Sequence, residues 1–131
     1  MLRLLVAEGN TPDGRRRWAE SAGATPAESY AEVLRKIAPD AQVDIFTPTD
    51  EGATLVAPLD AYDGIAITGS SLNIYRREAA SLRQIDFVRE AFSRAIPMFG
   101  SCWGLQLATV AAGGEVALNP HGREVAFARK T

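Results

Sequence analysis

Short apolar runs alternate with segments of helical periodicity along this chain, and this alternation limits its fold more than any other feature. Residues 2–7 are nearly all apolar, as a strand must be when both faces of a parallel sheet are buried. Apolar runs bounded by turn-forming residues predict the further strands. These are residues 42–48, 62–70, 96–102, 114–118 and 123–129.

Amphipathic helices are predicted between the strands. Thr25 can cap a helix, Pro26 suits its first position, and Glu28 completes a capping box before Pro39 stops the helix. Apolar residues at three- and four-residue spacing then form one face. They are Tyr30, Val33, Leu34 and Ile37 in this helix and Leu82, Ile85, Val88 and Phe92 in a second helix over 79–96.

A third helix is expected over 103–112, with Gly113 and Gly114 as its stop. Residues 8–24 are rich in turn-forming residues and predict a long loop that can include a short helical piece. Residues 49–61 form a polar, proline-containing connector whose structure the sequence leaves open. Strands that alternate with helices predict an α/β fold, an open and mainly parallel sheet with helices on both faces. At 131 residues, we expect one domain over 1–131.

Composition excludes several classes of function. A net charge of -2 argues against a nucleic-acid partner, and no apolar run approaches the roughly 20 residues of a membrane span. A cytoplasmic location is expected. The sequence contains no glycine-rich phosphate loop. A single cysteine and a single histidine can form neither an internal disulfide nor a metal-ligand set, so no cofactor is predicted.

The single cysteine, Cys102, lies in "GSCWGLQ" at the junction of a predicted strand and a predicted helix. Backbone N–H groups and the helix dipole at such a junction stabilise a thiolate, which is the nucleophilic form. Gly100 and Gly104 let strand, helix and substrate approach closely, as in a nucleophile elbow. A free cysteine is also often a small buried apolar residue. The spacing alone leaves both interpretations open.

The segment "GSCWGLQ" resembles the Gly-x-Cys-x-Gly-x-Gln signature of class I glutamine amidotransferases, at Gly100, Cys102, Gly104 and Gln106. "YDGIAITGSSLNIY" is similar to the oxyanion strand of that family. "NPHGREVAFARK" is similar to the stretch after the nucleophile helix in its GMP synthase-like members. The resemblance implies a flavodoxin-like fold and an enzyme that hydrolyses the side-chain amide of glutamine.

In this family, Cys102 would attack the amide and form a glutamyl thioester that water opens. The resemblance implies an oxyanion hole made by backbone N–H groups, one from Trp103 and one from the turn at Gly69 and Ser70. Gln106, with Gly104, would help to bind glutamine. The partner implied is a synthetase domain or subunit that accepts the ammonia.

The family completes its nucleophile with a histidine and a glutamate on a later segment. The only histidine of this chain, His121, aligns elsewhere, and we expect it to be a surface turn residue. The 131 residues are therefore expected to be the N-terminal part of a longer domain and to turn over glutamine slowly or not at all.

Two other functions stay open at this point. A hydrolase of the same architecture could use Cys102 on a γ-glutamyl conjugate, with water as the only acceptor. A non-catalytic binding or regulatory module could keep the turn without the partners of the thiol. Substrate profiling separates the first from a glutaminase, and the alkylation rate of Cys102 separates the second from both.

Overall fold

The structure of the chain is a computed structural model, and it describes residues 1–72, 78–118 and 120. Within these residues, four parallel strands form one sheet in the order β2-β1-β3-β4. The strands are β1 (Arg3–Ala7), β2 (Gln42–Phe46), β3 (Gly64–Ile67) and β4 (Met98–Gly100). The predicted parallel sheet is confirmed.

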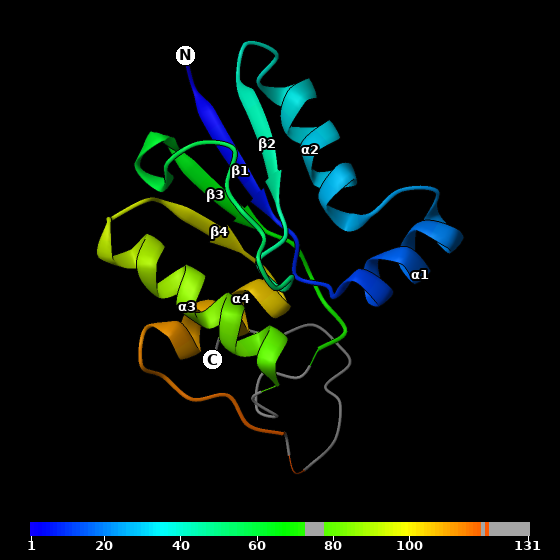
Figure 1. Ribbon diagram of the computed structural model, residues 1–131, viewed down its shortest axis with the longest axis vertical. Helices are drawn as coiled ribbons and strands as arrows, with labels where there is room; N and C mark the ends of the chain where they lie inside the picture. Colours follow the sequence, from blue (N-terminus) through cyan, green and yellow to red (C-terminus); the bar gives the residue numbers. More distant parts are fainter. Residues whose placement is uncertain (73–77, 119, 121–131) are drawn as a thin grey trace, which may run out of the picture.

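Helices cover both faces of this sheet, as predicted (Figure 1). Helix α2 (Pro26–Ile37) packs on β2 and β1, while α3 (Ala79–Ser93) and α4 (Trp103–Ala111) pack together over the opposite face. A short turn of 3-10 helix, η1 (Leu59–Ala61), precedes β3. Helix α1 (Pro12–Ala22) follows β1 and lies beside α2, beyond the carboxyl end of the sheet.

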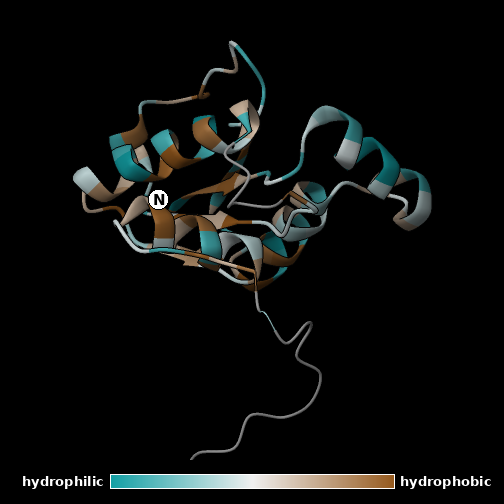
Figure 2. Ribbon diagram, turned by 90° about the horizontal axis from the view of Figure 1, so that it is seen from below, coloured by the Kyte–Doolittle hydropathy of each residue, from teal (hydrophilic) through white to brown (hydrophobic). Residues whose placement is uncertain are grey.

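Alternate side chains of β1 enter two separate apolar cores, as the period of two in a strand requires. Leu5 and Ala7 face α3 and α4, and Val6 faces α2. Figure 2 shows brown strand segments inside the molecule, whereas the helices carry both teal and brown stretches. Within the described residues, no helix is long and apolar enough to cross a membrane.

The start of α2 has the predicted capping box. The Thr25 side chain accepts from the Glu28 N–H, and the Glu28 carboxylate accepts from the Thr25 N–H. The predicted apolar face is only partly correct, however, because Val33 and Ile37 are exposed and the buried contacts come from Ala27 and Ala31. Small residues let the helix approach the sheet closely.

The buried face of α3 also differs from the prediction. Ile85 and Val88 are buried, but Leu82 and Phe92 are exposed. The buried face instead includes Ser81, Gln84 and Ala91, and hydrogen bonds to the Gly9 carbonyl and from the Trp103 indole hold Gln84 in the interior. Apolar periodicity cannot anticipate a buried amide.

The prediction of a loop over 8–24 was wrong, because residues 12–22 form α1. The Thr11 hydroxyl caps this helix by accepting from the Gly14 N–H, Pro12 occupies its first turn, and Gly23 ends it with a left-handed φ of 83°. The sequence feature that indicates this helix is the N-cap threonine followed directly by proline. No residue of α1 is buried, so the helix has no apolar stripe that a periodicity search could find.

Residues 114–118 are not a strand, and this prediction was wrong too. Helix α4 ends at Ala111, and Gly113 turns the chain with a φ of 96°. Most of the segment is exposed, and only Val116 packs against the core. Among the described residues, no strand pairs with this segment. The predicted strand 123–129 and His121 lie outside the described residues.

Candidate active site

Three loops meet at the carboxyl end of the sheet, which is where open α/β sheets bind their ligands. The strand register brings them together, because Ala7 of β1 pairs with Ile67 of β3, and Ile67 pairs with Gly100 of β4. The segments that follow these three residues carry Asn10, the turn at Gly69 and Cys102. Residues 59 to 92 positions apart in the sequence are therefore neighbours.

Cys102 occupies the N-cap position of α4 with φ 54° and ψ -113°. A positive φ is uncommon for a residue with a side chain and costs on the order of 1–3 kcal/mol, and such strain gathers at functional sites. The residue is exposed. Of the two interpretations that the sequence left open, the buried apolar residue is therefore wrong, and the turn presents the thiol to solvent.

The two glycines around Cys102 are required by close packing. A Cβ atom at Gly100 would lie 2.7 Å from the carbonyl carbon of Gly104, and a Cβ at Gly104 would lie 3.2 Å from the Ile67 oxygen. Strand β4 and helix α4 can thus turn back on each other only without side chains at these positions. Gly104 is a packing residue between α4 and β3.

A buried carboxylate lies beneath the loops. Glu8 is 1% exposed, and its Oε2 accepts from the Asn10 N–H at 3.1 Å, from Asn10 Nδ2 at 3.0 Å and from the Thr68 hydroxyl at 3.1 Å. Its Oε1 accepts from the Ala27 N–H at 3.1 Å. Because both carboxylate oxygens have donors, the group ties β1, β3 and the start of α2 together.

Asn10 carries this network up to the turn after β3. Its Nδ2 donates to the Gly69 carbonyl at 3.1 Å, and its Oδ1 accepts from the Ser71 N–H at 3.4 Å. A carbonyl and the following N–H point in opposite directions across a trans peptide, and the described chain has no cis peptide. With the Gly69 carbonyl held on Asn10, the Ser70 N–H points away from Asn10.

Trp103 anchors the start of α4 on the same loops. Its buried indole donates to Gln84 Oε1 at 2.9 Å, and Gln84 Nε2 donates to the Gly9 carbonyl at 3.1 Å. The backbone N–H of Trp103 is the first of the helix, where such groups have no acceptor within the helix. The Trp103 N–H thus directly follows Cys102 in the chain, and Ser70 lines the same cleft as Cys102.

A cleft of about 980 Å³ opens at this place. Part of its lining comes from the loops after the strands, with Cys102, Gly69 and Ser70 among them. Another part comes from the helices α1 and α2. The remaining lining residues are Asn10, Gly14, Arg17, Trp18, Ser21, Pro26, Ser29, Tyr30, Ser71 and Ser101.

Of the six site residues named from the sequence, Cys102, Gly69 and Ser70 line the cleft, and the other three do not line it within the described part of the chain. The buried Trp103 side chain is one of these three. Gln106 is half-buried one turn further along α4, and Gly104 is buried against β3. The sequence analysis missed Glu8, Asn10, Thr68 and Gln84. Glu8, Asn10 and Thr68 could have been noticed as polar residues that follow a buried strand. Gln84 could have been noticed as a polar residue on the helix face that covers the sheet.

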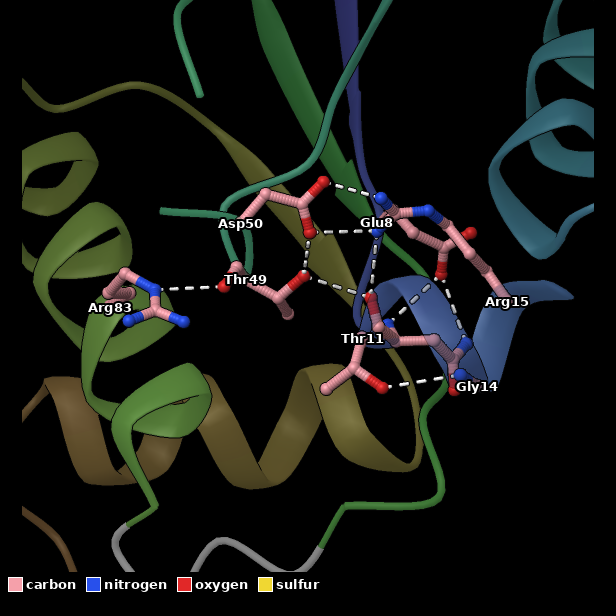
Figure 3. A network of polar contacts seen from close by, with 8 residues as sticks. Glu8, Thr11, Gly14, Arg15, Thr49, Asp50 and Arg83 are labelled. Atoms are coloured by element: carbon pink, nitrogen blue, oxygen red, sulfur yellow. Dashed lines mark hydrogen bonds and ion pairs between the residues drawn. The ribbon is translucent and has the colours of Figure 1, made fainter. Parts of the chain in front are cut away.

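Helix α1 is joined to the loop after β2 by the ion pair between Arg15 and Asp50 (Figure 3). Arg15 binds both carboxylate oxygens of Asp50, and this guanidinium lowers the pKa of Asp50. Arg83 of α3 donates to the Thr49 carbonyl at 2.8 Å, so the loop after β2 is itself anchored. No cluster of three metal-ligating side chains occurs among the residues described.

Comparison with known proteins is consistent with this geometry. The family model "Glutamine amidotransferase class-I" matches residues 23–130. A curated protein from Pseudomonas sp., gamma-glutamyl-L-1-hydroxyisopropylamide hydrolase, is 44% identical over 115 residues, which cover 88% of this chain and 39% of that protein. The chain thus spans about two fifths of the length of this relative.

Two solved structures share the fold. A glutamine amidotransferase from Thermotoga maritima superposes with a TM-score of 0.61 at 18% identity, over 86% of this chain and 43% of that one. A glutamine amidotransferase from Methylobacillus flagellatus superposes with a TM-score of 0.56 at 18% identity, over 92% of this chain and 43% of the other. At such low identity, these similarities establish the fold alone.

Proposed function

The chain belongs to the class I glutamine amidotransferase family, and from this premise we propose that it carries the nucleophile of an enzyme that cleaves γ-glutamyl amides. The observation that carries the proposal is Cys102, an exposed thiol on a strained turn at the edge of a large cleft. A buried or relaxed cysteine would give no such support.

The proposed reaction has two steps. The Cys102 sulfur adds to the γ-carbonyl carbon, the C–N bond breaks, and the nitrogen leaves as ammonia or an amine after taking up a proton. Water then adds to the thioester and the C–S bond breaks. This step releases glutamate and regenerates the Cys102 thiol. Water is the only co-reactant in the overall reaction.

Negative charge develops on the carbonyl oxygen in both steps. We propose that the N–H groups of Trp103 and Ser70 receive it, since one begins α4 directly after Cys102 and the other points away from Asn10. Preorganised donors of this kind are commonly worth about 10²–10³ in rate each. The proposed roles of Gln106 and Gly104 in binding glutamine have no support from the lining of the cleft.

Between the two amide substrates, the curated relative favours a substituted γ-glutamyl amide, because that protein is named as a hydrolase of one. Glutamine itself is the second candidate, favoured by the family, with a synthetase as the recipient of ammonia. Both share the thioester chemistry. They differ in whether the cleft must hold an amine beside the reacting bond.

We further propose that these residues are one part of a larger domain that supplies the base for the thiol. An apolar groove of about 300 Å³ supports this, lined by Leu4, Leu34, Ala66 and Phe99 on the face of the sheet where α2 covers only β1 and β2. Phe99 is 63% exposed there. Further elements of a longer sheet would bury this surface.

The test uses the full-length protein that carries this chain, with glutamine and N-alkyl γ-glutamyl amides as substrates. Release of glutamate and of the amine is measured for the unmodified protein and for Cys102→Ala, with Leu105→Ala as a control on the exposed side of α4. Hydroxylamine should trap the thioester as γ-glutamyl hydroxamate. Hydrolysis that survives in Cys102→Ala, or none in the unmodified protein with any substrate, would overturn the proposal.

A further inference from the structure

We propose that α1 and the start of α2 form a binding subsite for the amine portion of a γ-glutamyl amide, with Trp18, Tyr30 and Arg17 as its wall. The ligand assigned to it is an apolar or aromatic amine that carries a carboxylate, as in γ-glutamyl-phenylalanine. This inference rests on the proposed function, because it names the substrate class of the same thiol.

The size of the cleft is the first support. Ligand pockets commonly measure about 300–1,000 Å³, so a cleft of about 980 Å³ lies at the upper end of that range. A glutaminase releases ammonia, which needs no wall beyond the reacting bond. The part of the cleft between the thiol and the two helices therefore has room for a larger leaving group.

The construction of α1 is the second support. None of its residues is buried, so the helix adds nothing to either core. It is nevertheless capped at both ends, by the Thr11 hydroxyl and by the Gly23 N–H on the Ala19 carbonyl, and Arg15 ties it to Asp50 (Figure 3). A helix that is fixed without contributing to the core is explained by the side chains that it presents to the cleft.

Two aromatic rings give this wall its apolar character. Trp18, from the middle of α1, is 54% exposed and lines the cleft. Tyr30 faces the same cleft from α2 and is half-buried. Aromatic side chains provide large contact areas and lose little conformational entropy on binding, so the pair suits an apolar or aromatic body.

The arginines of α1 differ in their partners. Arg15 forms an ion pair with Asp50, and Arg16 forms one with Asp13. Arg17 lines the cleft, and among the described residues no carboxylate forms an ion pair with it. A guanidinium binds a carboxylate through two parallel hydrogen bonds, which is why the assigned amine carries one.

The experiment compares three substrates of the full-length protein: glutamine, γ-glutamyl-phenethylamide and γ-glutamyl-phenylalanine. We expect kcat/KM to be highest for γ-glutamyl-phenylalanine. Trp18→Ala should lower kcat/KM roughly tenfold or more for both aromatic substrates, with a several-fold smaller loss for glutamine. Arg17→Ala should lower it roughly tenfold for γ-glutamyl-phenylalanine and clearly less for the phenethylamide.

Arg16→Ala is the matched control, because this residue is the neighbouring arginine on the same helix and does not line the cleft. Binding of γ-glutamyl-phenylalanine to Cys102→Ala, measured by calorimetry, separates the two proposals. If no substrate is hydrolysed but binding is still weakened by Trp18→Ala and Arg17→Ala, the subsite stands without the reaction. Equal affinity and equal substrate preference in all three helix variants would overturn the subsite.

Discussion

Strand β4 lies between the two residues other than glycine that have a positive φ in the described part of the chain. Ala95 precedes the strand with φ 55°, and Cys102 follows it with φ 54°. The two backbones are unusual in the same way. They differ in what the unusual conformation achieves.

At Ala95 the conformation ends a helix. The Ala95 N–H donates to the Phe92 carbonyl at 3.0 Å, and the Ile96 N–H donates to the Ala91 carbonyl at 3.2 Å, which is the pattern of a Schellman motif. Glycine is the usual residue at this position. The methyl group of Ala95 therefore adds strain to a turn whose purpose is to end the helix.

At Cys102 the conformation presents a side chain. No side-chain hydrogen bond caps α4, and the residue is exposed, so neither helix capping nor burial explains the strain. The difference between the two ends of β4 shows that a positive φ by itself marks a backbone requirement. A positive φ at an exposed thiol that neither caps the helix nor fills the core supports the proposed functional role of Cys102.

The strongest test of this comparison is Cys102→Gly. We expect hydrolysis to fall by about 10⁴-fold or more, as when a nucleophile is removed, while the free energy of unfolding rises by about 1 kcal/mol as strain is relieved. Amine release and urea denaturation measure the two effects. Cys102→Ala should lose the activity without gaining stability, and a Cys102→Gly protein less stable than Cys102→Ala would break the comparison.

The second test, Asn10→Ala, removes a side chain that holds the turn at Gly69 at the carboxyl end of the sheet. Without its Nδ2, the Gly69 carbonyl loses a donor and the Ser70 N–H loses its orientation, so we expect kcat to fall by roughly 10- to 100-fold with KM changed much less. A purely structural residue would not produce this division between kcat and KM.

Thr49→Val is the control for that experiment. The buried Thr49 hydroxyl donates to the Asn10 carbonyl at 3.0 Å, and it makes no hydrogen bond to the turn at Gly69. We expect Thr49→Val to lower the free energy of unfolding about as much as Asn10→Ala does, but to lower kcat less. If the two variants lose the same kcat, Asn10 supports only the folded state.

Local signals account for the parts that the sequence predicted correctly. The capping box at Thr25, the buried strand over 2–7 and the strand-to-helix junction at Cys102 each depend on residues within a few positions of one another. The parallel sheet then follows from the order of elements. Propensity and periodicity are sufficient for such features.

The remaining features depend on contacts between distant residues. Asn10 meets Gly69 across 59 positions and Gln84 meets Gly9 across 75, so their roles exist only once the strand register is set. Helix α1 was not predicted because none of its residues is buried. The strand predicted over 114–118 is absent because a strand needs a partner strand to pair with. A periodic pattern of apolar residues indicates which face of an element is buried. Helix α1 and residues 114–118 are largely exposed, so such a pattern is no guide to their structure.

The amino end of β4 gives the third prediction, Ala95→Gly. Relief of the left-handed strain, less the extra entropy of glycine in the unfolded chain, should stabilise the protein by about 0.5–1 kcal/mol. Activity should stay unchanged, because Ala95 lies at the opposite end of β4 from the cleft. Urea midpoints of the variant and of the unmodified protein measure the gain, and a lower midpoint for Ala95→Gly would contradict it.

Acid gives the smallest expected effect and separates the cleft from the middle of the sheet. At the cleft end, the Arg15 guanidinium lowers the pKa of Asp50. Within β2, burial raises the pKa of Asp44, but hydrogen bonds from Tyr62 and Arg3 outweigh it and lower the pKa overall. Both depressed pKa values contribute stability that is present above the unfolded value of about 3.9 and is lost as pH falls through the folded value.

Denaturant unfolding between pH 5 and 3 should therefore show a smaller acid loss in Asp50→Asn and in Asp44→Asn than in the unmodified protein. Only Asp50→Asn should also weaken the preference for γ-glutamyl-phenylalanine over glutamine, because Asp50 holds α1 against the loop after β2 and Asp44 does not contact α1. If both variants changed the preference equally, the wall of the cleft would depend on overall stability rather than on the anchoring of α1.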